Sequence, residues 1–305
     1  MQLNAFQKTA LATVAATIFL IFVGGLVRAA GAGLGCPDWP QCFGLWIPPT
    51  SPDGLPSGFD ASQFNVFKTW TEYVNRLIGV LVGLLITATF LQSFRYRKSR
   101  PEVLIASFAA FILVLFQGWL GGMVVRSGLS TGIITIHMVT AMVILITLIY
   151  AVYRAMSDHF RIELDPGTRK KLLWVSGILL LITLVQLVIG TQVREAIDVI
   201  SRSGMYPDRA VWLDQTGLVD DIHRSSSWLV MIASGYLFWM VRRRTPSLFL
   251  GRLAALILAF VLMQVVIGIV LAYGGMPPAF QVLHLGFSSL LICSQFVFLM
   301  TVKDG

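Results

Sequence analysis

The stretch Thr71–Val80, TEYVNRLIGV, indicates how the chain is organised, because an altered copy of it occurs at Asp220–Ser227, DDIHRSSS. Glu72, Asn75 and Arg76 are spaced i, i+3 and i+4, so on a helix they share one face. The second copy repeats this spacing with Asp220, His223 and Arg224. A carboxylate, a potential metal ligand and a guanidinium at the start of two apolar segments indicate a protein built of two related halves.

The composition is typical of an integral membrane protein. Of the 305 residues, 56% are hydrophobic and only 12% are charged, and the mean hydropathy is +0.78. A net charge of +8 could indicate a nucleic-acid surface, but most of the basic residues lie in short segments beside apolar spans. We therefore expect a lipid bilayer around the chain and no nucleic acid as a partner.

Eight segments are long and apolar enough to span a bilayer, which takes about 20 residues. They are predicted near residues 10–30, 70–94, 103–125, 132–153, 172–193, 219–241, 251–273 and 279–302. An even number of spans places both termini on one side, and most of the 23 Lys and Arg residues lie on that side. The positive-inside rule then predicts cytoplasmic termini, with the long loops 29–69 and 194–218 outside.

An internal repeat organises these spans. Asn75 precedes His223 by 148 positions (75 to 223), and His137 precedes His284 by 147 (137 to 284). The 147-residue offset also relates two Gln-x-x-x-Gly pairs, Gln117/Gly121 and Gln264/Gly268. We predict an all-α membrane protein of two tandem, pseudo-symmetric four-helix bundles, residues 1–156 and 157–305.

Three histidines stand near the outer ends of predicted spans, at one depth: His137, His223 and His284. A single membrane histidine is more often a packing residue, but three at one depth, in repeated positions, favour a ligand role. Imidazoles on facing helices of a bundle suit haem iron. His223 and His284 would be the axial pair of a haem b in the second half, a ligation that suits electron transfer.

The matching positions in the first half are Asn75 and His137. Asparagine is a poor iron ligand, so a haem there would depend on His137 alone or would not be held by its iron. We therefore expect the first half to handle a substrate and the second to hold a permanent cofactor.

Charged residues near the same level have two readings each. The arginines could pair with the propionates of haem, or extend from the helix ends to the interface: Arg28, Arg76, Arg194 and Arg224. Glu72 could point at the edge of a bound ring or accept from the first amides of its own helix. Cys36 and Cys42 lie on the outer, oxidising side, where they could form a structural disulfide or a reversible thiol relay.

Taken together, the motifs resemble those of the haem A synthases over nearly the whole chain. The resemblance rests on Gly24–Arg28 (GGLVR), Gly33–Cys42 (GLGCPDWPQC), the Glu72 motif and the histidines of the fourth, sixth and eighth spans. Any one of these pieces alone would be unspecific, whereas their combination is specific.

This resemblance implies an enzyme that oxidises the C8 methyl of haem O to the formyl of haem A by successive hydroxylations, with loss of water from the geminal diol. It implies haem b between His223 and His284, substrate haem O near Glu72 and His137, and a redox role for Cys36 and Cys42. Haem O synthase and cytochrome oxidase assembly factors would be its partners, and the bacterial cytoplasmic membrane its location.

One position departs from the family pattern. The family usually has Glu-x-x-His-Arg in the second span, and position 75 here is Asn. Either the synthase works with one protein ligand fewer on its substrate haem, or the chain has lost or changed the reaction. Retention of Glu72, Arg76, His137 and both loop cysteines favours the first option. The alternatives are a non-catalytic membrane cytochrome b, for electron transfer or haem carriage, and a secondary transporter, which draws only on the repeat.

Overall fold

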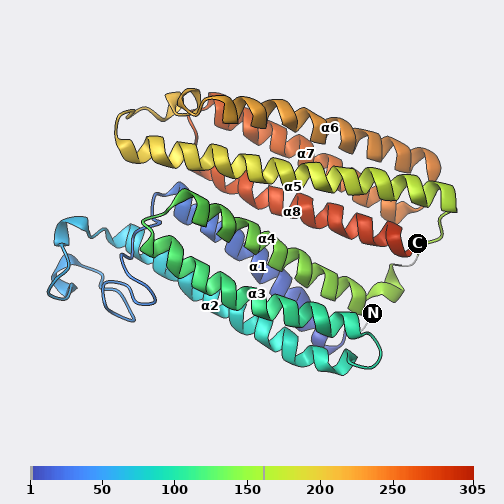
Figure 1. The fold of residues 1–305 in the computed structure, drawn as a ribbon, viewed down its shortest axis with the longest axis horizontal. Helices are drawn as coiled ribbons and strands as arrows, with labels where there is room; N and C mark the ends of the chain where they lie inside the picture. Colours follow the sequence, from blue (N-terminus) through green and yellow to red (C-terminus); the bar gives the residue numbers. More distant parts are fainter. Residues whose placement is uncertain (1–2, 161) are drawn as a thin grey trace. The chain divides into compact units, whose positions relative to one another are not determined.

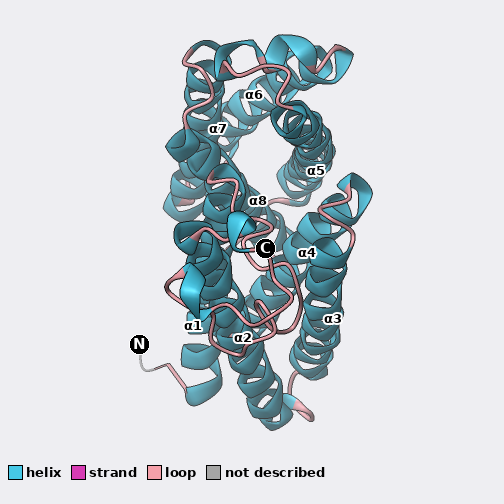
Figure 2. Cartoon of the chain, turned by 90° about the vertical axis from the view of Figure 1, so that its left-hand side faces the viewer, coloured by secondary structure: helices cyan, strands magenta, loops and turns pink. Residues whose placement is uncertain are grey.

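The computed structural model describes residues 3–160 and 162–305, and the regular structure of these residues is helical, without strands (Figures 1 and 2). The eight long helices are α1 Ala5–Ala29, α2 Val66–Ser93, α3 Pro101–Arg126, α4 Thr131–Ala155, α5 Pro166–Ser203, α6 Leu218–Arg244, α7 Leu248–Tyr273 and α8 Pro278–Asp304. Short 3-10 turns occur only in the connections. The predicted all-α class is therefore confirmed for the described part of the chain.

Seven of these helices are long and apolar enough to cross a membrane, as expected of a multi-pass membrane protein. Helix α6 does not belong to this set. Its first turns carry the polar run Asp220–Ser227 and its last turn carries three arginines, so too little of it is apolar. An eighth span therefore stays a prediction.

The helices divide into two compact units, residues 1–155 with α1–α4 and residues 156–305 with α5–α8. In the first unit each helix packs on the next, and α1 also packs on α4. The second unit repeats this pattern, with α5 against α8. Each unit is thus a ring of four helices in which α2 and α4, or α6 and α8, are diagonal partners.

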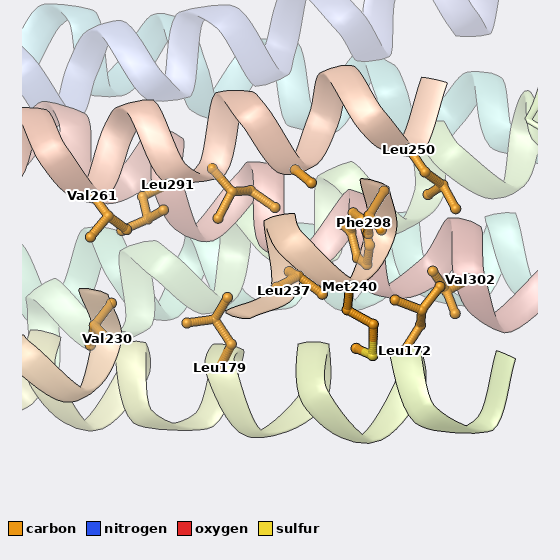
Figure 3. Packing of buried hydrophobic residues seen from close by; sticks show 13 residues of the cluster. Leu172, Leu179, Val230, Leu237, Met240, Leu250, Val261, Leu291, Phe298 and Val302 are labelled. Atoms are coloured by element: carbon orange, nitrogen blue, oxygen red, sulfur yellow. The ribbon is translucent and has the colours of Figure 1, made fainter. Parts of the chain in front are cut away.

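Apolar side chains pack together in the part of each unit that lies away from the histidines. In the second unit the buried cluster includes Leu172 of α5, Met240 of α6, Leu250 of α7 and Phe298 of α8 (Figure 3). Smaller clusters do the same in the first unit, around Phe6 and Tyr96 and around Val82 and Ile86. None of these clusters includes a histidine, so the histidines lie outside the main apolar packing of each unit.

Helix α5 corrects one predicted boundary. The loop expected at 194–218 begins as helix, because α5 continues to Ser203 and ends at Gly204, whose φ of 66° is in the left-handed region. Ile197 on this extension and Val193 just before it are buried with Trp212 in one apolar cluster. The prediction followed the apolar run, whereas an amphipathic helix continues where the residues are charged on one face and packed on the other.

Candidate functional site

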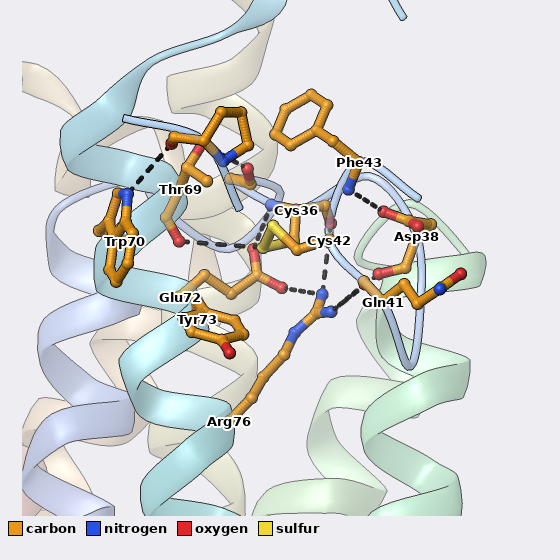
Figure 4. Close-up of a disulfide and its surroundings, with 12 residues drawn as sticks. Cys36, Asp38, Gln41, Cys42, Phe43, Thr69, Trp70, Glu72, Tyr73 and Arg76 are labelled. Atoms are coloured by element: carbon orange, nitrogen blue, oxygen red, sulfur yellow. Dashed lines mark hydrogen bonds and ion pairs between the residues drawn. A yellow bond between two sulfur atoms is a disulfide. The ribbon is translucent and has the colours of Figure 1, made fainter. Parts of the chain in front are cut away.

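The first candidate site lies where a long loop meets α2. This disulfide loop, residues 30–65, closes on itself through Cys36–Cys42 (Figure 4). It approaches α2 very closely: a Cβ at Gly35 would lie 2.3 Å from the carbonyl oxygen of Lys68, so only glycine fits. The Thr69 hydroxyl donates to the Gly35 carbonyl over 2.8 Å. The loop and the first turns of α2 therefore form one packed structure.

Glu72 is buried at this contact, with 4% of its surface exposed. Its Oε2 accepts the backbone N–H of Cys36 over 3.0 Å, and its Oε1 pairs with Arg76 over 2.5 Å (Figure 4). Glu72 lies in the second turn of α2, which Asn65 caps. The carboxylate thus accepts from the disulfide loop, a partner that neither reading of the sequence included.

Arg76 also holds the disulfide loop, through the carbonyl oxygens of its backbone. Its Nη1 donates to the carbonyl oxygens of Asp38 and Gln41, each over 2.8 Å, and its Nη2 also donates to that of Cys36 over 3.3 Å. These carbonyls belong to the segment that the disulfide closes. Protein contacts therefore account for this guanidinium, and its pairing with a propionate stays a prediction.

The loop also reaches the third helix. A Cβ at Gly122 of α3 would lie 2.9 Å from the ring of Trp39, so the indole packs directly on the helix backbone. Asp38 shapes the turn behind it by accepting the N–H groups of Phe43 and Gly44. The disulfide segment therefore covers the space between α2 and α3 at this end of the unit.

Each of the three histidines is held by a glutamine on the preceding helix. The side-chain amide nitrogen donates to the backbone carbonyl of the histidine in all three pairs: Gln117 to His137 at 3.0 Å, Gln186 to His223 at 2.7 Å and Gln264 to His284 at 2.8 Å. A Gln-x-x-x-Gly spacing accompanies each pair, because a glycine follows each glutamine by one turn. We call this arrangement a glutamine clamp.

The glycine of each clamp lies against the imidazole. A Cβ there would meet Cε1 of the histidine: Gly121 at 3.6 Å from His137, Gly190 at 2.9 Å from His223 and Gly268 at 3.9 Å from His284. Gly24 of α1 has the same relation to Asn75, with Oδ1 3.9 Å from its hypothetical Cβ. All four positions of the repeat therefore have a glycine on the facing helix, which makes room for the side chain.

His223 and His284 come together across the second unit, with ring centroids 6.3 Å apart. Two metal–imidazole bonds of about 2 Å each, together with the radii of two rings, span nearly this separation. Among residues 3–160 and 162–305, no group of three or more His, Cys, Asp or Glu side chains could hold a metal ion. Two imidazoles suffice for haem, however, because the porphyrin supplies the other ligands. The residues present fit a haem.

Orphaned polar atoms occur at three of the four repeated positions. Nδ1 of His137, Nδ1 of His284 and Oδ1 of Asn75 are buried and have no hydrogen-bond partner in the protein. Buried polar atoms are normally satisfied, and an unsatisfied one often marks the place of a ligand or water. These atoms are therefore a structural sign of binding at three of the four repeated positions.

The other predicted arginines have protein partners. Arg28 Nη1 lies 3.1 Å from the sulfur of Met138. In the second unit, Arg194 pairs with Asp198 and contacts Gln281, and Arg224 pairs with Asp220 at 2.8 Å. The structure thus brings Glu72, Arg76, Cys36 and Cys42 together, and brings His223 to His284.

Gln186 is a site residue that the sequence reading missed. Its Nε2 also lies 3.1 Å from Nδ1 of His223, and its Oε1 accepts from the Ser226 hydroxyl over 2.6 Å. The signal was available, because Gln186 and Gly190 repeat the spacing of the two pairs already recognised. Its different offset, which follows from the longer first loop, concealed it.

Replacing Gly190 by alanine is expected to displace His223, because the new methyl carbon would lie 2.9 Å from Cε1. We expect a cost of about 1–3 kcal/mol in stability and weaker retention of any haem in the second unit. The measurements are thermal unfolding and the haem content of the purified protein. Gly235→Ala is the matched control, since nothing lies within 4 Å of a Cβ there. Equal behaviour of the two variants would contradict the packing described.

Comparison with known proteins gives a consistent result. The sequence model of a family described as cytochrome oxidase assembly protein (COX15-CtaA) matches residues 7–296. A protein of Bartonella tribocorum named heme A synthase is 23% identical, over 90% of this chain and 86% of its own length. One of Shewanella oneidensis with the same name is 24% identical, over 92% and 91%. A third, of Alkalihalophilus pseudofirmus, is 34% identical over 43% of the chain.

Proposed function

The chain belongs to the COX15-CtaA family of cytochrome oxidase assembly proteins, and from that premise we propose that it is a haem A synthase. The membership confirms the resemblance seen in the sequence. The proposed reaction oxidises the C8 methyl of haem O to the formyl of haem A. The observation that carries the proposal is the family match over residues 7–296, shared by relatives that are named for this activity.

In the second unit, His223 and His284 would hold a haem b. Their ring separation of 6.3 Å supports this assignment. When bound, such a haem supplies one-electron transfer. Gln186 and Gln264 fix the helix backbone at both histidines, so the imidazoles are positioned by the protein itself. Arg194 and Arg224 stand at the same end of the unit as candidates for the propionates.

In the first unit, haem O would lie near His137, Asn75 and Glu72, with Arg28 and Arg76 at its edge. With water as the source of oxygen, conversion of a methyl to a formyl group (R–CH3 + H2O → R–CHO + 4 H⁺ + 4 e⁻) proceeds through two hydroxylations and loss of water from the geminal diol. The electrons pass to an external electron acceptor, and two protons are released at each hydroxylation. Glu72 is the carboxylate of this region that the protein holds in one orientation, by Cys36 N–H and Arg76. We assign it the role of accepting those protons at its carboxylate oxygens.

The disulfide would hold Glu72 and its partner Arg76 in position. Arg76 binds three carbonyls in or beside the closed segment, and Cys36 donates to the carboxylate, so the closed loop fixes both partners of the ion pair. This is a positioning role for Cys36 and Cys42. A relay role, in which the disulfide takes up two electrons and two protons to become two thiols, is the alternative. Labelling of the cysteines during turnover distinguishes the two, because only the relay exposes thiols.

We place the protein in a bacterial cytoplasmic membrane, with both termini on the cytoplasmic side. The basic segments that follow α2, α4 and α6 support this orientation. The disulfide loop would then be outside, where a disulfide is stable. Haem O synthase and other assembly factors of cytochrome oxidase would be its protein partners.

A non-catalytic cytochrome b is the second candidate, and one observation favours it. Both oxygens of Glu72 already have protein partners, as they would in a residue that only holds the loop. Such a protein would bind haem b and leave haem O unchanged.

Expression of the chain together with a source of haem O tests the proposal. We expect haem A in the extracted pigments, identified by mass spectrometry, and none in cells that lack the chain. Folded protein loaded with haem b, with haem O as the only other pigment, would contradict the synthase and support the cytochrome.

Arg76→Lys is expected to lower haem A formation by about tenfold or more, since a lysine cannot donate in the fixed fork that joins Glu72 to the loop. Haem b should be retained. Maleimide labelling should show faster reduction of Cys36 and Cys42 by a mild reductant. Arg154→Lys is the matched control, because Arg154 pairs with Glu102 at the other end of the same unit. A loss of activity of the same size in both variants would contradict a specific role for Arg76.

A further inference from the structure

The four repeated positions differ in one respect. Three of them carry a complete glutamine clamp, in which a Gln-x-x-x-Gly pair on one helix holds the histidine of the next. The fourth has Gly24 against Asn75. Gly24 and Gly190 are equivalent, so the residue equivalent to Gln186 is Leu20, four positions before Gly24.

Leu20 and Asn75 therefore replace the clamp and its histidine together. A leucine side chain has no donor for the carbonyl of residue 75, and an asparagine has no imidazole. The two changes are consistent with each other, because a clamp without a histidine to position serves no purpose. The departure at position 75 thus extends to the helix that packs on it.

Asn75 nevertheless keeps the character of a binding position. Its Oδ1 is buried and has no hydrogen-bond partner in the protein, and the same is true of Nδ1 of His137 in the same unit. Asparagine is also shorter than histidine, and Gly24 adds no side chain on the facing helix. An amide with an unpaired acceptor therefore stands where the other unit has an imidazole.

We propose that the first unit holds its haem through His137 alone and that the Asn75 side is a binding site for a small ligand, of the class of diatomic gases and small anions. This rests on the proposed function, because the first unit must accept a haem. The Asn75 amide, which has both donor and acceptor atoms, would contact the ligand. The second unit should have no such site, because both of its repeated positions carry a histidine, His223 and His284.

Carbon monoxide is the probe for the full-length protein, purified from cells that make haem O, so that it carries haem b together with haem O or haem A, and then reduced. We expect two haems and one bound carbon monoxide per chain, by pigment analysis and difference spectra. His137→Ala should abolish that binding and leave the haem of the second unit in place. The double variant Leu20→Gln/Asn75→His rebuilds the clamp and its ligand, so carbon monoxide affinity should fall by about tenfold or more.

The single variants are the matched controls. Leu20→Gln alone should bind carbon monoxide as the unaltered protein does, and Asn75→His alone should lose less affinity than the double variant, because its imidazole is not positioned. Two haems per chain without carbon monoxide binding would overturn the inference, and so would binding that persists in His137→Ala. A single haem per chain, lost in His284→Ala, would overturn both the inference and the substrate site. Carbon monoxide binding without haem A formation would leave the inference standing and remove the synthase.

Discussion

Replacing Glu72 by glutamine is expected to lower haem A formation by about a hundredfold, the size typical for loss of a positioned acid or base. Glutamine keeps the shape of the side chain and can still accept from the N–H of Cys36, so the loop should remain docked. It removes the negative charge and the basic oxygen that we assign to the released protons. The measurement is the rate of haem A formation per mole of protein, with haem b content determined on the same samples.

Glu102→Gln is the control for this variant. Glu102 is also a carboxylate paired with an arginine, Arg154, over 2.8 Å in the same unit, but it lies at the first turn of α3, away from the disulfide loop. The Glu102→Gln variant should form haem A at a rate within a factor of about two of the unaltered protein, because a partly exposed ion pair contributes little. Full activity of Glu72→Gln, or equal losses in both variants, would remove Glu72 from the chemistry and favour the cytochrome.

Replacing either His223 or His284 by alanine is expected to abolish the low-spin haem spectrum of the second unit. The two rings lie 6.3 Å apart, and removal of one leaves a single imidazole where a six-coordinate iron needs two. Haem A formation should stop as well, because the proposed route for electrons is lost. Absorption spectra of the oxidised and reduced purified variants make the measurement.

His137→Ala separates this result from general damage to the protein. His137 has the same glutamine clamp as His284, so the two substitutions remove equivalent side chains from equivalent structures. The low-spin spectrum of the second unit should persist in His137→Ala and disappear in His284→Ala. Loss of that spectrum in all three variants would contradict the assignment of separate sites to the two units.

The helices could be predicted because each is a long apolar run between polar segments. Prediction from the sequence failed where a helix extends beyond its apolar run. Residues 194–203 are charged on one face, and the apolar run alone does not show that α5 continues through them, with Val193 and Ile197 packed on Trp212. Helix α6 was predicted near residues 219–241 and is present at Leu218–Arg244, but its polar start Asp220–Ser227 lowers its hydropathy, so only its crossing of the membrane stays a prediction.

The surroundings of Glu72 could not be predicted. Its spacing from Arg76 places both on one helix face, and the structure bears this out. Its other partner, Cys36 N–H, comes from a loop 36 residues earlier, and nothing in a local pattern indicates such a contact. The role of Gly35 is equally non-local, since only the approach of the Lys68 carbonyl requires a glycine there.

The internal repeat is the most informative feature of the sequence. It singled out Asn75 as the position without a histidine. Gln186 and Gly190 also belonged to it, but their offset from α1 differs from that of the other pairs. Only the contact of Gln186 with His223 shows that the third pair is a clamp, and hence that Leu20 is the exception.

The haem content of the purified chain, from cells that make haem O, tests the central claim most directly. We expect haem b together with haem O or haem A, one of each kind per chain. His284→Ala should remove the haem b alone, and His137→Ala should remove the haem O and haem A alone. A chain that carries only haem b, or one in which His137→Ala leaves haem O and haem A in place, would contradict the account.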